Sequence, residues 1–211
     1  MGPLSKEAMV AGSRSFSSTC FVFPLLLFVL ASLASAARAQ SATYASAKRA
    51  TKDVIVGPLR TQWAMTEDLV MGIAGIIPES LYDFRPTPEV RSFRELLTHI
   101  ASENALYMPI VAGEPGPDRA KIEALQGREE ILKALEESYA YGTRTLARMT
   151  DETAADVIDV RGQKALRWYA ALFNIWDNMD HYGNLVVYVR LNKLTPPRPP
   201  AGQRRRQQQG Q

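Results

Sequence analysis

Apolar side chains recur at helical spacing in four long segments of the chain, and each segment predicts an amphipathic helix. No segment alternates between apolar and polar residues in a way that predicts a strand, although residues 156–160 form a short ambiguous run. The predicted helices cover residues 54–77, 92–112, 128–149 and 163–192. Four amphipathic helices joined by one or two longer connections describe an all-α fold, a four-helix bundle.

Residues that start and stop helices support these boundaries. Pro78 ends the first predicted helix because proline cannot continue the backbone hydrogen bonding. Ser92 and Glu95 have the spacing of a capping box at the start of the second helix. We expect Pro109 to kink the last turn of that helix, which ends before the glycine- and proline-rich residues 113–117.

The first 39 residues have the organisation of a secretory signal peptide. A polar, weakly basic stretch precedes the uncharged apolar residues 21–36, and small residues follow. We prefer cleavage after Ala39, with Ala36 as the second choice. The alternative is a membrane anchor, but the apolar run is shorter than the roughly 20 residues that a spanning helix needs. The chain is therefore expected to be exported, to the periplasm or the medium.

After removal of the signal peptide the chain divides into three parts. Residues 40–53 form a linker, residues 54–197 form the helical bundle, and the Pro-, Arg- and Gln-rich residues 198–211 form a disordered tail. The sole cysteine, Cys20, lies within the signal peptide. The mature chain is therefore expected to have neither a disulfide nor a cysteine-ligated zinc site.

The positive charge of the chain lies at its two ends. The whole sequence has 25 basic and 22 acidic residues, whereas residues 40–197 have 18 basic and 21 acidic residues, a net charge of −3. A mildly acidic body lacks the basic surface that binds phosphate backbones. We therefore expect a small-molecule substrate or ligand, no nucleic-acid partner, and no membrane contact after cleavage of the signal peptide. Whether the bundle forms a homodimer is left open.

Polar side chains interrupt the apolar faces of two predicted helices. At about 100° per residue, His99 and Glu103 fall on one face of the second helix among leucine and isoleucine side chains. Asn174, Asp177 and His181 lie within roughly 60° of one another around the fourth helix. Burial without partners costs roughly 2–7 kcal/mol for an amide and more for a carboxylate. These side chains must therefore meet one another, water or a metal ion.

Two interpretations fit this pattern. In the first, His99, Asp177 and His181 bind a divalent cation between two helices, and two imidazoles with one carboxylate suit zinc, nickel, iron(II) or manganese. In the second, Asp177 holds His181 or His99 in a buried hydrogen-bonded pair and no metal is involved. The residue pattern alone leaves both open.

The fourth helix also carries a specific motif. Residues 174–197 read Asn-Ile-Trp-Asp-Asn-Met-Asp-His-Tyr-Gly-Asn, followed by an apolar stretch, Tyr-Val-Arg and a Pro-Pro exit. This motif resembles the C-terminal signature of the DinB/YfiT-like superfamily, in which two histidines four residues apart precede Tyr/Arg-Gly-Asn/Gln. Residues 83–99 resemble the family's approach to its first histidine. The resemblance covers residues 58–197.

The resemblance implies a four-helix bundle that holds a divalent metal, usually described as zinc- or nickel-like, through three histidines. Carried over residue by residue, the first ligand falls on His99 and the third on His181. The middle ligand falls on Asp177, where the family usually has histidine, so this chain either binds its metal with altered affinity or has lost it. Asp180, where relatives often have glutamate, is given no more than a supporting role beside the ligands.

Characterised relatives include thiol-dependent transferases and isomerases, so the resemblance implies a metal-dependent enzyme. Export weakens the thiol-dependent version, because reduced thiols are scarcer outside the cytosol, and makes a metal-dependent hydrolase an equal expectation. Glu103 shares the His99 face and is the candidate general base. The alternative is a non-catalytic exported bundle without metal, whose aromatic fourth helix binds a small apolar ligand or a protein partner.

Overall fold

The computed structural model describes residues 38, 40, 41 and 53–197, and it divides the chain into one unit before Lys52 and another from Lys52 onward. The helical bundle belongs to the second unit and is described on its own. Apart from the few residues just named, the predicted signal peptide, linker and tail lie outside the described residues. In the part of the chain that is described, no helix is both long and apolar enough to cross a membrane.

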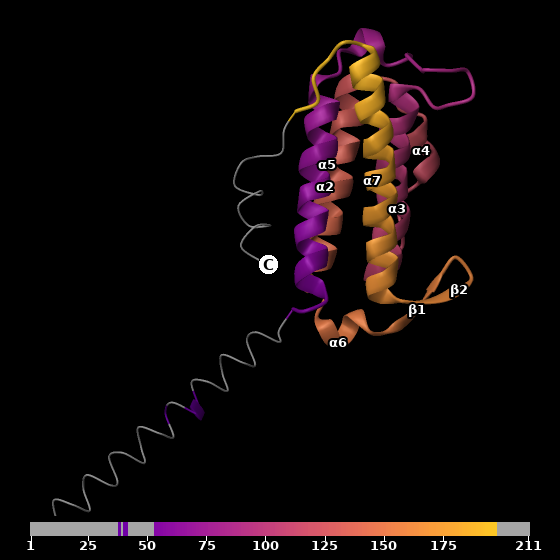
Figure 1. Cartoon of the computed structure of the whole chain (residues 1–211). Helices are drawn as coiled ribbons and strands as arrows, with labels where there is room; N and C mark the ends of the chain where they lie inside the picture. Colours follow the sequence, from indigo (N-terminus) through magenta and orange to yellow (C-terminus); the bar gives the residue numbers. More distant parts are fainter. Residues whose placement is uncertain (1–37, 39, 42–52, 198–211) are drawn as a thin grey trace, which may run out of the picture. The chain divides into compact units, whose positions relative to one another are not determined.

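Four long helices form the bundle (Figure 1). They are α2 (Val56–Ile76), α3 (Phe93–Ala112), α5 (Arg128–Arg148) and α7 (Arg167–Leu191). α3 packs against α5 and α7, and α2 packs against the same two helices, so each helix has two neighbours around one core. The predicted all-α four-helix bundle is confirmed.

A long connection allows α3 and α5 to run in the same direction. The Arg94 guanidinium, in the first turn of α3, donates to the carbonyl of Gln126, just before α5. Arg148, at the end of α5, pairs with Glu114, just after α3, at 3.0 Å. The starts of the two helices therefore lie together, as do their ends. The chain returns along the bundle through α4 (Arg119–Glu123), a short helix that our sequence analysis did not predict.

α3 begins where the sequence predicts, directly after Ser92. The Ser92 hydroxyl accepts a hydrogen bond from the backbone N–H of Glu95, and the Glu95 carboxylate accepts one from the backbone N–H of Ser92. The predicted capping box is thus confirmed, and it fixes the start of the helix that carries His99. Gly113 ends this helix with a φ of 72°, a left-handed conformation that glycine adopts without strain. Pro109 lies inside the last turns of the helix.

A small β-hairpin precedes α7 and corrects the expectation that the chain has no strands. β1 (Val157–Val160) and β2 (Gln163–Leu166) pair antiparallel from end to end. Arg161 and Gly162 form the turn, with φ values of 57° and 85° that suit the right-handed twist of a two-residue hairpin. The fourth helix therefore begins at Arg167 rather than at residue 163. The strands lack an obvious alternating pattern because neither strand has a buried residue.

α2 and α5 pack closely against each other on the side of the core away from α3 and α7. The Trp63 ring lies against Gly142, where a Cβ atom would be 2.2 Å from Trp63 Cζ2. The Trp63 indole N–H donates to the carbonyl oxygen of Tyr139 at 3.1 Å, and the two rings lie 5.1 Å apart. A glycine at position 142 is therefore required for this packing. The buried stripe of α5 consists of Ile131, Leu135, Ser138, Tyr139, Gly142, Thr145 and Leu146.

Candidate metal centre

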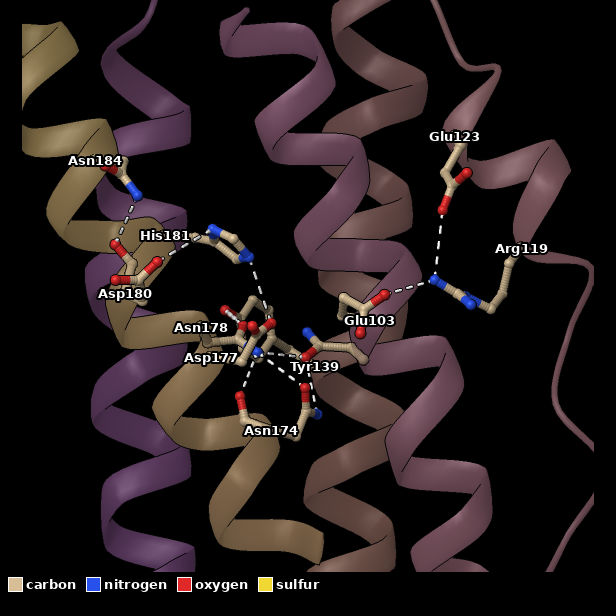
Figure 2. A network of polar contacts seen from close by, with 11 residues as sticks. Glu103, Arg119, Glu123, Tyr139, Asn174, Asp177, Asn178, Asp180, His181 and Asn184 are labelled. Carbon is tan, nitrogen blue, oxygen red and sulfur yellow. Dashed lines mark hydrogen bonds and ion pairs between the residues drawn. The ribbon is translucent and has the colours of Figure 1, made fainter. Parts of the chain in front are cut away.

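The structure brings the three predicted metal ligands together. His99 lies on α3, and Asp177 and His181 lie one turn apart on α7, where Figure 2 shows the latter two side by side. One ligand atom from each of the three side chains lies within 4.8 Å of the others. The two imidazole rings meet edge to face, with centroids 4.8 Å apart and an interplanar angle of 76°. Helical spacing places Asp177 beside His181, and the packing of α3 against α7 adds His99.

Buried ligand atoms in this cluster have no hydrogen-bond partners. Oδ2 of Asp177 lies 3.4 Å from Nε2 of His181, but the pair does not meet the angular requirements of a hydrogen bond. Neither of these atoms, nor Nδ1 of His181, has another hydrogen-bond partner among the described residues. Among the described residues, Asp177 therefore makes no hydrogen bond to His181 or His99 of the kind that our second interpretation required, although Asp177 and His181 lie at ion-pair distance. Leaving such atoms unpaired is costly, and a cation would satisfy them.

The donor set fits a divalent metal ion. Two imidazoles and one carboxylate are ligands for zinc, nickel, iron(II) and manganese. Bonds of about 2.0–2.2 Å place neighbouring ligand atoms of a tetrahedral zinc site roughly 3.4 Å apart. The observed spacing of up to 4.8 Å is wider than this, so an ion would draw the three side chains inward by a small adjustment. Asp180 lies at the edge of the cluster, with Oδ2 3.9 Å from His181 Nδ1 and a side chain that is 70% exposed.

The electrostatic surroundings of His99 favour its neutral form. Burial, and next the positive charge of Arg91, lower the pKa of His99 to about 4, against an opposing effect of Asp177. The imidazole is therefore uncharged at neutral pH and keeps a lone pair on one ring nitrogen. A neutral imidazole is the form that binds metal ions.

Glu103 lies one turn after His99 but is engaged by a neighbouring arginine. Its Oε1 atom is 2.5 Å from Nη2 of Arg119. Figure 2 shows this ion pair. Burial raises the pKa of Glu103 above its ordinary value, Arg119 opposes this effect, and the charge of Asp177 adds to it. The pKa of Glu103 therefore depends in part on the charge of Asp177 at the candidate metal centre. The role of Glu103 as a general base stays a prediction.

The short helix α4 holds these groups in place. Nε of Arg119 donates to the carbonyl and the hydroxyl of Ser102 on α3, at 3.1 and 2.9 Å. The Ser102 hydroxyl in turn donates to Oε1 of Glu123 at 2.6 Å. Since Arg119 and Glu123 both come from α4, these contacts fasten α4 to the turn of α3 that lies between His99 and Glu103. No pattern of apolar residues predicted this helix, which is docked by these polar contacts and by Ile122, whose side chain packs against the core.

A buried polar network lies next to the candidate metal centre on α7 (Figure 2). The Oδ1 atom of Asn104 accepts hydrogen bonds from the amides of Asn174 and Asn178, at 3.1 and 2.9 Å. The Tyr139 hydroxyl donates to Oδ1 of Asn178 at 2.6 Å, and Nδ2 of Asn104 donates to the Ser138 hydroxyl at 3.1 Å. Asn174, which helical spacing grouped with Asp177 and His181, thus belongs to this network. The network joins α3, α5 and α7, and our sequence analysis missed it.

A pocket of about 320 Å³ lies beside His99. Its lining residues come from the start of α3, from the residue before its cap and from the end of α4. They are Arg91, Glu95, Thr98, His99 and Glu123. The pocket thus opens onto one of the three candidate metal ligands.

Solved structures with the same fold support the bundle as described. A DinB-like protein from Bacillus cereus ATCC 10987 aligns over 64% of this chain and 91% of its own, with a TM-score of 0.58 and 13% identity. A DinB-like protein from Bacillus subtilis aligns over 67% and 96%, with a TM-score of 0.56 and 19% identity. A conserved protein from Enterococcus faecalis aligns over 64% and 95%, with a TM-score of 0.55 and 17% identity. At these identities the likeness shows the fold alone.

The sequence itself shows the family. No curated protein is significantly similar to this chain. The sequence profile of the DinB superfamily, however, matches residues 59–185, which span α2 to most of α7 and include His99, Asp177 and His181. The match covers more than half of the chain, and the solved structures agree with it in fold. The chain therefore belongs to the DinB superfamily.

Proposed function

We propose that this chain binds one divalent metal ion through His99, Asp177 and His181 and acts as a metal-dependent enzyme on a small-molecule substrate. The observation that carries the proposal is the cluster of three ligand side chains in which buried atoms have no hydrogen-bond partner. Among the described residues, this is the group of histidine and acidic side chains whose ligand atoms are close enough to share an ion. The reaction is either hydrolysis or transfer to a thiol.

The roles of the side chains follow from their charges. A bound divalent ion acts as a Lewis acid and lowers the pKa of a water or thiol beside it. His99 contributes a neutral imidazole, and Asp177 contributes the negative charge that offsets part of the charge of the ion. Oε1 of Glu103 is held by Arg119, while Oε2 has no partner in the described part of the chain and is left to accept a proton.

The carboxylate of Asp177 bears on which metal is bound. Oxygen ligands suit manganese and iron(II), whereas imidazoles suit zinc and nickel. Replacement of the family's usual middle histidine by Asp177 therefore moves the preference of the site toward manganese and iron(II). We also propose that the chain is exported by its first 39 residues, in which case the scarcity of reduced thiols outside the cytosol favours hydrolysis.

Metal content tests the proposal directly. The purified chain, loaded with zinc, nickel or manganese and then passed through a desalting column, is analysed by mass spectrometry of the elements. We expect close to one ion per chain for the wild type, and almost none for His99→Ala and Asp177→Asn. Asp180→Asn is the matched control, because its carboxylate is close to His181 but exposed, and it should keep its ion. A wild-type chain without metal would refute the proposal.

A non-catalytic role is the second candidate. Tyr169 and Trp176 on α7 are 51% and 66% exposed, and a pocket of about 400 Å³ lies between α7, α3 and the hairpin. Aromatic side chains of Tyr107, Tyr169 and Phe173 line it. If the wild type holds no metal, binding of a small apolar probe that quenches tryptophan fluorescence, and loss of that binding in Phe173→Ala, would support this function instead.

A further inference from the structure

The charged residues of the pocket beside His99 are not all paired. Glu95 accepts a hydrogen bond from the backbone N–H of Ser92 and pairs with Arg85 at 3.1 Å. Glu123 accepts from the Ser102 hydroxyl at 2.6 Å and lies 3.5 Å from Arg119. Each carboxylate of the pocket is therefore paired with an arginine that does not line it, and Glu123 shares its arginine with Glu103.

Arg91 is the positively charged residue that lines this pocket. Its guanidinium forms no ion pair or hydrogen bond with any residue in the range 53–197. The backbone carbonyl of Arg91 accepts a hydrogen bond from the Tyr188 hydroxyl at 2.8 Å, which ties the main chain just before α3 to α7. The main chain at Arg91 is thus held in place while its side chain remains available for a ligand. Among the charged side chains that line the pocket, Arg91 is therefore the one without a partner of opposite charge in the described residues.

We propose that Arg91 binds a carboxylate of the substrate, so that the substrates of this chain are small carboxylic acids whose reacting end reaches the metal ion beside His99. This inference rests on the proposed function, because it assumes that an ion is bound by His99, Asp177 and His181. A guanidinium matches the two oxygens of a carboxylate with two parallel hydrogen bonds.

The charge balance of the pocket argues for a singly charged group. Glu95 and Glu123 line the same pocket as Arg91, and each is paired with an arginine outside it. A phosphate with two negative charges would therefore meet one unpaired cation. A carboxylate has one charge and matches the single arginine. Held at both ends, the substrate is oriented toward the ion, which is how a binding residue remote from the reacting atoms contributes to rate.

Thiol ligands with and without a carboxylate provide the test. The full chain is loaded with cobalt(II), whose absorption spectrum changes when a thiolate binds to it. 3-Mercaptopropionate is compared with 3-mercaptopropanol, and mercaptoacetate with 2-mercaptoethanol, so that two lengths are covered. For the wild type we expect at least one of the acids to bind about tenfold more tightly than its uncharged partner, which corresponds to about 1.4 kcal/mol. High salt should reduce this preference because Arg91 is exposed.

Variants assign the preference to Arg91. In Arg91→Gln the acid and its uncharged partner should bind equally, and the affinity for the uncharged thiol should stay at the wild-type value. Arg190→Gln, which removes an exposed arginine of α7 outside this pocket, should keep the tenfold preference. Equal binding of acid and alcohol to the wild type, or a preference that persists in Arg91→Gln, overturns the inference while the metal proposal stands. Cobalt binding without any effect of the four ligands also overturns it. Failure of cobalt to bind at all removes the proposed function and this inference together.

Discussion

Tyr139→Phe tests whether the buried polar network fixes α7 in the bundle. The substitution deletes one hydroxyl and leaves the ring, so the packing of Tyr139 against Trp63 is kept. The hydroxyl donates at 2.6 Å to Oδ1 of Asn178, and both residues are buried. Oδ1 of Asn178 accepts no other hydrogen bond from the described residues. Removal of the Tyr139 hydroxyl therefore leaves the buried side-chain oxygen of Asn178 without a hydrogen-bond donor.

The size of the effect follows from that unpaired oxygen. Leaving a buried acceptor without its donor costs about 1–3 kcal/mol. A chain of this size loses roughly 2–4 °C in Tm for each kcal/mol. A loss of about 2 kcal/mol in the free energy of unfolding thus corresponds to a fall in Tm of about 4–8 °C.

A second tyrosine of α5 provides the matched control. The hydroxyl of Tyr141 also donates at 2.6 Å, to Oε2 of Glu114, but this hydrogen bond is exposed to solvent. In Tyr141→Phe water replaces the lost partner, so we expect a loss below about 1 kcal/mol. Urea unfolding followed by circular dichroism measures both variants against the wild type. If Tyr139→Phe is no more destabilising than Tyr141→Phe, the conclusion that the network ties α7 to α5 across the core is wrong.

Two further changes test the packing of α2. Gly142→Ala places a Cβ atom 2.2 Å from the Trp63 ring and should lower the free energy of unfolding by about 1–3 kcal/mol, whereas Gly183→Ala, with no neighbour within 4 Å, should not lower it. Asp151 accepts hydrogen bonds from the backbone N–H groups of Val56 and the two residues before it, which lower the pKa of Asp151. A lowered carboxyl pKa stabilises the fold above the pKa of the unfolded chain, about 3.9. Asp151→Asn should therefore be less stable than the wild type at pH 7, and urea titrations should show this difference shrinking as the pH falls below about 4.

Local features of the fold were predictable because neighbouring residues determine them. The capping box at Ser92 and Glu95 requires two residues three positions apart and an amphipathic helix that follows them. Both features are visible in the sequence. The sequence left residues 156–160 ambiguous and predicted no strand, because β1 and β2 have no buried residue and neither shows the alternation of a half-buried strand. The turn residues Arg161 and Gly162 also lack the Asn-Gly or Asp-Gly signal of such hairpins.

The position of the apolar face of α3 shows a limit of periodicity. We placed His99 and Glu103 on the apolar face, but the structure leaves both partly buried at its edge. The centre of that face contains Phe93, Leu97, Ile100, Ala101, Asn104 and Met108. The row of residues that contains His99 and Glu103 and the row that contains Leu97 and Ile100 are both apolar enough to predict a buried face. The positions of α5 and α7 decide which row is buried.

The sequence by itself determined that four helices form, where α3 begins, and that Asp177 and His181 lie one turn apart, because helical geometry depends only on residues close in the chain. The meeting of His99 with this pair was expected from the family resemblance, and the packing of α3 against α7 brings it about. Only the tertiary structure decided that Arg119 pairs with Glu103 and that Asn104 joins Asn174 and Asn178. Those contacts connect residues that lie far apart in the chain. They depend on how whole faces of helices pack, and the spacing within a single helix does not specify its partner.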